Sequence, residues 1–201
     1  MLNLASLREC RLSVAILVAG MPGSGKSLVS KAAESLGVKV VRMGDIVRLL
    51  ASSTAQELSD RVLGELSRKI REVHGPDVVA RATLHIACNE SPGGVVLIEG
   101  VRSLDEVRYF KDHAERCVVV AVHSPPQVRF QRLLARGRSD DPSSWEDFAA
   151  RDERELSFGL GSVIALADYV IVNHEKTPEE VLQESKNLLR RILGECQQGA
   201  R

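Results

Sequence analysis

Short apolar runs alternate along this chain with longer stretches in which apolar residues recur at helical spacing. The runs are continuous enough to be strands buried on both faces of a sheet. They cover residues 14–19, 38–43, 95–98, 118–123 and 169–173. Strands that alternate with helices predict an α/β domain, with a five-stranded parallel sheet between two layers of helices.

Two of the helices have clear end signals. The segment after Lys26 carries apolar residues at helical spacing and stops at Gly37. The segment after the fifth run has Thr177 in the N-cap position, Pro178 at the first helical position and Glu180 in capping-box register. We therefore expect one helix from Lys26 to about Gly37 and another that starts at Pro178.

A glycine-rich loop joins the first strand to the first of these helices. It fits the pattern G-x-x-x-x-G-K-[ST], in the strand–loop–helix context that a phosphate-binding loop requires. The backbone N–H groups of such a loop form an anion nest, the lysine reaches the β- and γ-phosphates, and the hydroxyl binds Mg²⁺. The predicted nucleotide-binding residues are Gly20, Met21, Pro22, Gly23, Ser24, Gly25, Lys26 and Ser27.

The composition of the chain argues against several classes of protein. The 201 residues carry 27 basic and 27 acidic side chains, so there is no overall basic field that would favour nucleic acid. No apolar run is long enough to span a bilayer, and residues 1–10 make a poor signal peptide. Four cysteines show no C-x-x-C pair or metal-ligand spacing, and we expect reduced thiols in a cytoplasmic protein. The whole chain, 1–201, is predicted to be a single domain.

Charged residues follow the ends of the second and third strands, where parallel sheets bind ligands. Asp45 and Arg48 are three apart at a helix start: Asp45 can hold a Mg²⁺-bound water and Arg48 an acceptor phosphate. The alternative is a first-turn helix cap beside a solvated arginine. Glu99 ends the third strand, where P-loop folds place a metal-associated carboxylate, and Arg102 can bind a phosphate. The alternative there is a polar strand end that leads into a helix.

The region after the fourth strand is rich in arginine. Arg129, Arg132 and Arg136 share one helical face, a flexible loop follows at 137–142, and Arg151 lies in the next helix. A mobile basic hairpin of this kind is expected for a lid over the donor phosphates, here at about 136–157. A solvated helical pair held by ion pairs is the structural alternative.

The residues at the end of the third strand help to distinguish phosphoryl transfer from ATP hydrolysis. Many P-loop ATPases place a second acid beside that carboxylate, but Gly100 follows Glu99 here. Phosphoryl transfer to an oxyanion needs alignment and charge neutralisation more than a strong base. The sequence therefore favours a kinase, while slow ATP hydrolysis assisted by Glu99 stays open.

Taken together, the motifs at 20–27, 44–48, 99–102 and 167–173 and the arginine-bearing lid resemble those of nucleoside monophosphate kinases. Segments 44–48, 136–146 and 155–161 more closely resemble the archaeal adenylate-kinase-related family of P-loop proteins, over about residues 12–195. The resemblance implies a three-layer P-loop fold with a helical acceptor-side insertion at about 45–90 and a small lid. It also implies ATP and Mg²⁺ as cofactors and a small phosphorylated acceptor.

Residue by residue, the resemblance implies five groups of sites. Lys26 and Ser27 would serve the donor phosphates, and Ser27, Asp45 and Glu99 would surround the metal. The acceptor would contact Asp45, Arg48 and Arg102. Arg102 would act catalytically together with Lys26 and the lid residues Arg132, Arg136 and Arg151. Asn173 would lie near the donor base.

The chain departs from adenylate kinases at several positions. Met43 stands in place of a threonine, Glu99 in place of an aspartate, and Val101 in place of a Phe-Pro pair, and residues 49–90 do not match the AMP-binding segment. The short spacing from the loop to Asp45 also resembles dephospho-coenzyme A kinases. A nucleoside monophosphate kinase is thus the main hypothesis. The alternatives are dephospho-coenzyme A kinase-like activity, a slow ATPase, or a non-catalytic nucleotide switch.

Overall fold

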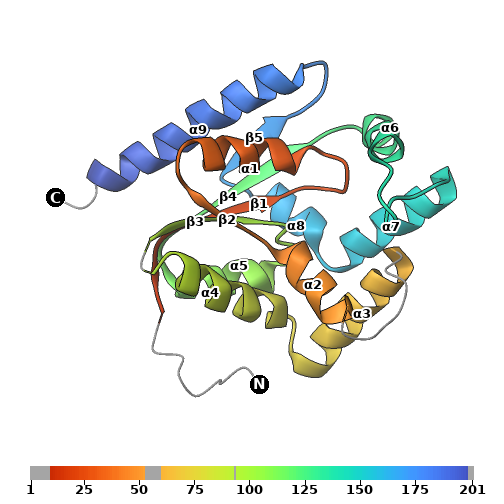
Figure 1. Ribbon diagram of the computed structural model, residues 1–201, viewed down its shortest axis with the longest axis horizontal. Coiled ribbons are helices and arrows are strands. Elements are labelled where there is room, and N and C mark those ends of the chain that lie inside the picture. Colours follow the sequence, from red (N-terminus) through yellow and green to blue (C-terminus); the bar gives the residue numbers. More distant parts are fainter. Residues whose placement is uncertain (1–9, 53–59, 93, 199–201) are drawn as a thin grey trace.

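A parallel five-stranded sheet forms the centre of the molecule. The computed structural model describes residues 10–52, 60–92 and 94–198. The sheet has the order β2-β3-β1-β4-β5, and every neighbouring pair of strands is parallel (Figure 1). Its strands are β1 (Leu12–Ala19), β2 (Lys39–Arg42), β3 (Val95–Glu99), β4 (Ala114–His123) and β5 (Tyr169–Val172). This confirms the predicted α/β fold and its five strands.

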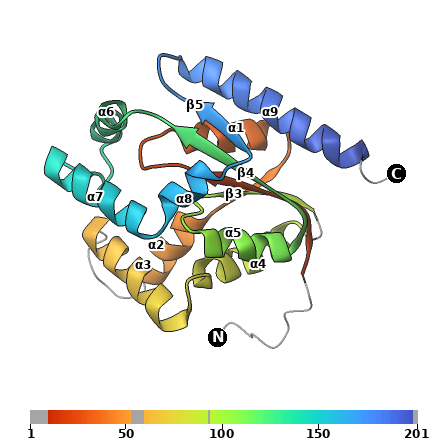
Figure 2. The same cartoon turned by 180° about the vertical axis from the view of Figure 1, so that it is seen from behind.

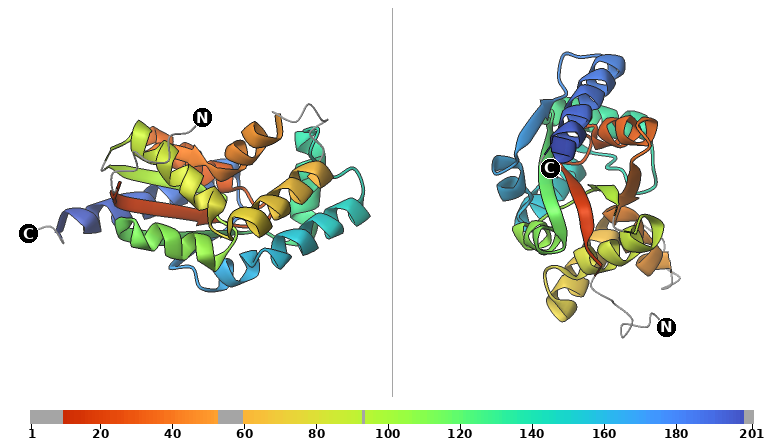
Figure 3. Two further views of the ribbon diagram at one scale, coloured as in Figure 1. Left: turned by 90° about the horizontal axis from the view of Figure 1, so that it is seen from below. Right: turned by 90° about the vertical axis from the view of Figure 1, so that its left-hand side faces the viewer.

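Helices cover both faces of the sheet (Figures 1 and 3). On one face, α1 (Lys26–Ser35) and α9 (Pro178–Gln198) pack over Val14, Ile16 and Val18 of β1. On the other face, α4 (Val78–Glu90), α5 (Leu104–Asp112) and α8 (Leu160–Ala165) pack over the alternate residues of the same strand. Because successive side chains of a strand point to opposite faces, the continuous apolar run of β1 supplies both cores.

Four helices gather at the end of the molecule that lies away from the C-terminus (Figure 2). They are α2 (Met43–Ser52), α3 (Asp60–His74), α6 (Pro126–Arg136) and α7 (Trp145–Ser157). Helices α2, α3 and α4 occupy the predicted insertion at 45–90, of which 53–59 lie outside the described residues. The predicted lid at 136–157 corresponds to the end of α6, the loop after it and α7.

The predicted helix boundaries are close to those observed. Helix α1 begins at Lys26 and ends two residues before Gly37, and α9 begins at Pro178. Its capping box forms as expected: the Thr177 N–H donates to Glu180 Oε2 at 2.7 Å, and the Glu180 N–H donates to Thr177 Oγ1 at 3.2 Å. Strand β4 starts four residues before the predicted run, because Ala114, Arg116 and Cys117 pair with β1 although the polar Glu115 and Arg116 interrupt the apolar pattern.

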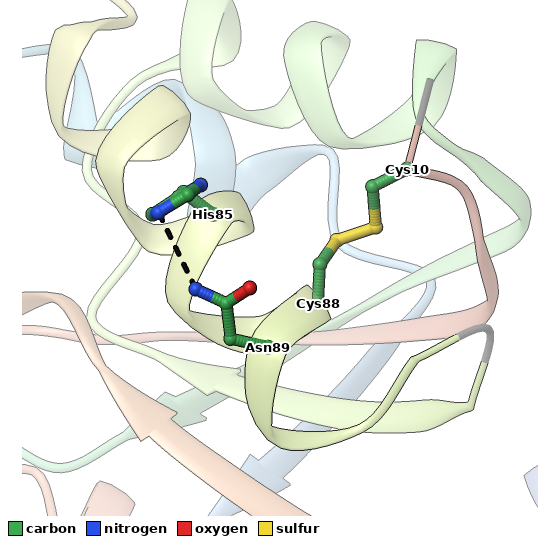
Figure 4. Close-up of a disulfide and its surroundings, with 4 residues drawn as sticks. All are labelled: Cys10, His85, Cys88 and Asn89. Atoms are coloured by element: carbon green, nitrogen blue, oxygen red, sulfur yellow. Dashed lines mark hydrogen bonds between the residues drawn. A yellow bond between two sulfur atoms is a disulfide. The ribbon is translucent and has the colours of Figure 1, made fainter. Parts of the chain in front are cut away.

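The prediction that all four cysteines are reduced thiols is wrong for two of them. Cys10 and Cys88 form a disulfide with a Cα–Cα separation of 6.2 Å (Figure 4). Cys10 lies just before β1, and Cys88 lies near the end of α4, which leads into the neighbouring strand β3. The sheet therefore brings together two residues that are 78 positions apart, a pairing that sequence spacing could not show. Cys117 is a free thiol, and burial raises its pKa to about 12.

None of the helices in the described ranges is long and apolar enough to cross a membrane.

Candidate functional site

The glycine-rich loop lies between the carboxyl end of β1 and the first turn of α1. All three of its glycines have positive φ angles, 153° at Gly20, 79° at Gly23 and 98° at Gly25, which residues with a Cβ rarely adopt. A Cβ at Gly23 would lie 3.1 Å from the Cα of Arg129, so the loop backbone packs directly on α6. Gly25 is the N-cap of α1 and has no side-chain cap bond. The first N–H groups of α1 therefore remain available to an anion.

The side chain of Lys26, the first residue of α1, reaches back to the start of the loop. Its Nζ donates to the carbonyl oxygens of Gly20 at 2.6 Å and Met21 at 3.2 Å. Burial lowers the pKa of this ammonium to about 8, although Glu99 and Glu155 act in the opposite direction. A cation held in a poorly solvated place gains strongly from a bound polyphosphate.

One large cavity, of about 820 Å³, opens at the carboxyl ends of the strands. Of the sixteen residues predicted for the site, all but Met21 and Ser24 line it. Met21 packs against one of the two apolar cores, and Ser24 is fully buried. The predicted residues on the wall are Gly20, Pro22, Gly23, Gly25, Lys26, Ser27, Asp45, Arg48, Glu99, Arg102, Arg132, Arg136, Arg151 and Asn173.

The candidate metal ligands lie on this wall at different depths. Glu99 is mostly buried, and its Oε2 accepts from Ser30 Oγ at 2.5 Å and lies 3.5 Å from Arg42 Nε. Ser30 is three residues after Ser27 on α1, so the serine that holds the acid lies on the same helix face as the loop hydroxyl. The side chain of Asp45 is 65% exposed and pairs with Arg48 at 3.1 Å.

These residues fit Mg²⁺ held mainly by phosphate oxygens and water. The described part of the chain contains no cluster of three or more His, Cys, Asp or Glu side chains that could hold a metal alone. Nucleotide-bound Mg²⁺ does not require one, because it takes one or two protein ligands and completes its octahedron with phosphate and water. The hydroxyl of Ser27 and the carboxylate of Glu99 supply that number.

Carboxylates from the lid hold several of the arginines. Asp140 Oδ2 accepts from Arg48 Nη2 at 2.9 Å, which joins α2 to the lid loop. Its neighbour Asp141 pairs with Arg136 and lies 3.6 Å from Arg151. The side chain of Asp141 is 2% exposed, and hydrogen bonds from Arg136 and Arg138 hold its pKa below the usual value despite burial.

Arg102 follows β3 and pairs with the buried Glu155 of α7 at 3.2 Å. A second acid, Glu106, fixes the backbone at this point, because its Oε2 accepts from the Arg102 N–H at 2.7 Å. The other oxygen of Glu106 accepts from Arg71 of α3 at 2.6 Å. Arg102 is thus held between the sheet, the insertion and the lid.

Arg132 and Asn173 support the loop from the β5 side. Arg132 donates to Ser124 Oγ at 2.9 Å and to Asn173 Oδ1 at 3.1 Å, both neutral oxygens, and burial lowers its pKa. Asn173 is 2% exposed, and its Nδ2 donates to the Ser24 carbonyl at 2.9 Å. The amide of Asn173 therefore holds the loop backbone, although the residue also borders the cavity.

Sequence reasoning missed several residues of this network. Ser30 and Arg42 hold Glu99, and Glu155 holds Arg102. Arg129, predicted to share the lid face, instead forms a buried pair with Asp152 and donates to the Pro22 carbonyl at 3.2 Å. The i,i+3 spacing of Ser27 and Ser30 was a usable signal, but the other pairs join distant segments of the chain.

A 2-3-1-4-5 parallel sheet with a G-x-x-x-x-G-K-S loop after its central strand defines a P-loop kinase-like protein. The chain belongs to the family whose model is described as "AAA domain", matched over residues 19–149, and to the UPF0200 proteins. The UPF0200 protein of Staphylothermus marinus is 48% identical over 178 residues, 89% of this chain and 92% of that one. That of Hyperthermus butylicus is 50% identical over 180 residues, 90% and 95% of the two chains.

Solved structures share the fold at low sequence identity. The shikimate kinase of Bacteroides thetaiotaomicron has a TM-score of 0.57 and 18% identity, over 88% of this chain and 98% of that one. TT1252 of Thermus thermophilus reaches 0.61 with 20% identity, over 92% and 98%. A gluconokinase of Sinorhizobium meliloti reaches 0.54 with 16% identity, over 95% and 99%. The fold is therefore that of small P-loop kinases.

Proposed function

We propose that this protein transfers the γ-phosphoryl group of ATP, with Mg²⁺, to a small phosphorylated acceptor, and that the acceptor is a nucleoside monophosphate. The observation that carries the proposal is a cavity whose wall brings the phosphate-binding loop together with arginines from α2, from the β3–α5 turn and from the lid. At about 820 Å³ it is near the upper end of the usual range for small-molecule sites, as two substrates require.

In this proposal the loop binds the donor. Its backbone N–H groups and the positive end of α1 hold the phosphates, and Lys26 places its charge at the β- and γ-oxygens. Asn173 and Arg132 contribute by holding the loop from behind through Ser24 and Ser124. Asn173 thus supports donor binding by holding the loop in shape. Its predicted position near the donor base would be a second role.

Ser27, Glu99 and Asp45 belong to the proposed metal side. Mg²⁺ would neutralise charge on the β- and γ-phosphates when bound. Ser27 offers its hydroxyl, and Glu99 its carboxylate, held in place by Ser30 and Arg42. Asp45 is more exposed and fits an outer role through water.

Arg48 and Arg102 form the proposed acceptor side, with Asp45 beside them. Both line the cavity at the ends of the strands next to the loop, and both are already oriented by carboxylates. An arginine fork suits a phosphate, and its position is fixed before binding, which limits the entropy lost on association.

The lid arginines complete the proposed mechanism. Arg136 precedes the lid loop at the end of α6, and Arg151 follows the loop in α7. Arg132 lies one turn before Arg136 on α6. Their charge near the transferring group would stabilise a loose, anionic transition state, and the lid would exclude water that competes with the acceptor. We also propose that the activity resembles that of adenylate kinases and that the protein acts in the cytoplasm.

The test is a panel of acceptors. Nucleoside monophosphates and dephospho-coenzyme A are each incubated with Mg²⁺-ATP, and acceptor-dependent ADP formation is measured. We expect at least one nucleoside monophosphate to stimulate ADP formation, and Lys26→Ala to abolish the stimulation. Stimulation by dephospho-coenzyme A alone would move the assignment to that class. Acceptor-independent turnover, or nucleotide binding without turnover, would favour an ATPase or a switch.

A further inference from the structure

Helix α5 begins with a capping box that departs from the usual pattern. Its N-cap Ser103 accepts from the Glu106 N–H at 3.2 Å, as expected. In the usual box the glutamate accepts in return from the N–H of the N-cap residue, as Glu180 does from Thr177 in α9 at 2.7 Å. Glu106 instead accepts from the N–H of Arg102, one residue before the cap, at 2.7 Å. The glutamate of this box therefore fixes the backbone of an arginine in the cavity wall.

The second oxygen of Glu106 is bound from the insertion. It accepts from Arg71 Nη2 of α3 at 2.6 Å. Arg71 also donates to the Ser67 carbonyl at 3.0 Å, and its guanidinium lies over the ring of Phe158, 5.1 Å from the centroid, where α7 ends. One carboxylate thus ties the backbone of Arg102 to the insertion and, through Arg71, to the end of the lid helix.

This ion pair is shielded from water. Glu106 is fully buried, and the side chain of Arg71 is 10% exposed. A buried ion pair is a poor means of stabilising a fold, because the cost of desolvation offsets the attraction and apolar side chains of similar volume often do better. What charged hydrogen bonds add is a fixed direction and distance between the groups that they join. Here they join α3 to the residue whose guanidinium lies in the cavity wall.

We propose that Glu106 and Arg71 are positioning residues for the acceptor, which set the place of Arg102 in the cavity wall relative to helix α3. Because Arg102 is taken as an acceptor residue, this role rests on the proposed function. Neither Glu106 nor Arg71 lines the large cavity, so both act through the backbone of Arg102 and not on the substrate. Helix α3 then contributes to acceptor recognition without touching the acceptor.

The first test requires no turnover and follows hydrogen exchange at the Arg102 amide by NMR in the full-length protein. Glu106→Gln keeps the shape of the side chain but has one carbonyl oxygen, so its NH₂ group must face one of the two donors. We expect exchange at Arg102 to become about tenfold faster or more in Glu106→Gln and in Arg71→Met. Exchange at Ile16 in the central strand reports opening of the whole fold in the same spectra. Arg68→Met is the control, an α3 side chain that is 68% exposed.

The second test separates acceptor binding from stability. With the nucleoside monophosphate that stimulates ADP formation most, Glu106→Gln should raise the acceptor KM about tenfold, while kcat and the KM for ATP change little. Asp168→Asn is the matched control. Asp168 Oδ2 also accepts from a backbone N–H, that of Val119 at 2.7 Å, but the residue does not line the cavity. Its loss should lower the melting temperature and leave the acceptor KM unchanged.

Arg71 offers a rescue experiment. Arg71→Met and Arg71→Lys both lose the guanidinium that lies over Phe158, but lysine keeps a cation within reach of Glu106. We therefore expect the acceptor KM to rise in Arg71→Met and to recover most of the way in Arg71→Lys. An equal rise in both variants, or a loss of stability in Glu106→Gln with neither KM changed, would show a role in packing alone and overturn the inference.

The failure of this inference can be told from the failure of the proposed function. Acceptor-dependent transfer with an unaltered acceptor KM in Glu106→Gln and Arg71→Met would refute the positioning role and leave the function standing. Faster exchange at Arg102 in both variants, in a protein that phosphorylates no acceptor, would support the link from α3 to Arg102 and refute the function.

Discussion

At the scale of single residues, Lys26 is the most informative, because its identity follows from the motif but its acidity follows from the fold. Burial lowers its pKa to about 8, so in the nucleotide-free protein it is charged below that pH and loses its proton above it. A bound polyphosphate favours the charged form, so binding at higher pH must be accompanied by proton uptake.

We therefore predict a pH-dependent affinity for AMP-PNP with Mg²⁺. The Kd should be nearly constant below pH 8 and rise by up to about tenfold per pH unit above it, because one proton must be taken up on binding. Calorimetric titrations between about pH 7 and 10 measure this. Lys26→Arg is the control, because a guanidinium stays charged over the whole range. A flat Kd in the wild type would contradict the assignment.

Arg102 carries the second prediction at this scale. Arg102→Lys keeps the charge near Glu155 but loses the planar fork, so the acceptor KM should rise about tenfold or more while the KM for ATP changes little. Steady-state kinetics with both substrates varied provide the measurement. Arg108→Lys, a side chain 68% exposed on α5, is the matched control. If the KM for ATP rises and that for the acceptor holds, Arg102 serves the donor.

Residue-level reasoning found fourteen of the twenty-five described residues of the cavity wall, because each of these follows a strand end or belongs to a motif with its own chemistry. It could not find the residues that hold this wall in place. Glu155 and Arg102 are far apart in the sequence, and so are Arg42 and Glu99. Such pairs depend on tertiary contact and leave no periodic signal.

At the scale of elements, the phosphate-binding loop depends on β5 as much as on its own glycines. A Cβ at Gly25 would collide with the side-chain amide of Asn173, whose nitrogen donates to the Ser24 carbonyl at 2.9 Å. Ser124, after β4, accepts from Arg132 and donates to the Asn173 carbonyl at 2.6 Å. The loop is therefore held in shape by the ends of two other strands.

Asn173→Ala tests this support. The substitution leaves the Ser24 carbonyl without its amide donor in a buried place, so we expect a loss of about 1–3 kcal/mol in stability and weaker nucleotide binding. Urea unfolding and AMP-PNP titration measure the two effects. Asn187→Ala in α9, where the amide makes an exposed bond to Gln183, should change neither. Unchanged nucleotide binding in Asn173→Ala would show that the loop holds its shape without β5.

The elements themselves were predictable because the apolar runs and capping signals are local. The start of β4 was not, since Glu115 and Arg116 interrupt the apolar pattern there and the strand is extended by pairing with β1. The lid loop was predicted from its glycine and proline, but its two aspartates prove to be the partners of Arg48, Arg136 and Arg151.

At the scale of the whole molecule, the disulfide and the cavity lie at opposite ends of the sheet. Cys10 precedes β1 and so lies at the amino ends of the strands, whereas the cavity is at their carboxyl ends. The bridge joins residues 78 positions apart, and the segment between them contains the phosphate-binding loop and most of the insertion. It constrains the unfolded chain without touching the site.

Cys88→Ser should therefore lower the free energy of unfolding by about 2–4 kcal/mol, with turnover retained at temperatures where the variant is folded. Denaturant unfolding under oxidising conditions measures the loss. Cys10→Ser should cost about the same, and the double variant no more than either single one, because all three remove the same bridge. Additive losses, or a wild type whose stability does not respond to a reductant, would contradict the bridge.

The central claim is that γ-phosphoryl groups leave this site on an acceptor instead of on water. The most direct measurement uses ATP labelled in its γ-phosphate, with Mg²⁺ and the acceptor panel, and follows where the label goes. The account predicts label in a phosphorylated organic product, formed only with an acceptor and lost in Lys26→Ala. Label that appears only as inorganic phosphate, or that stays in ATP with every acceptor, would contradict it.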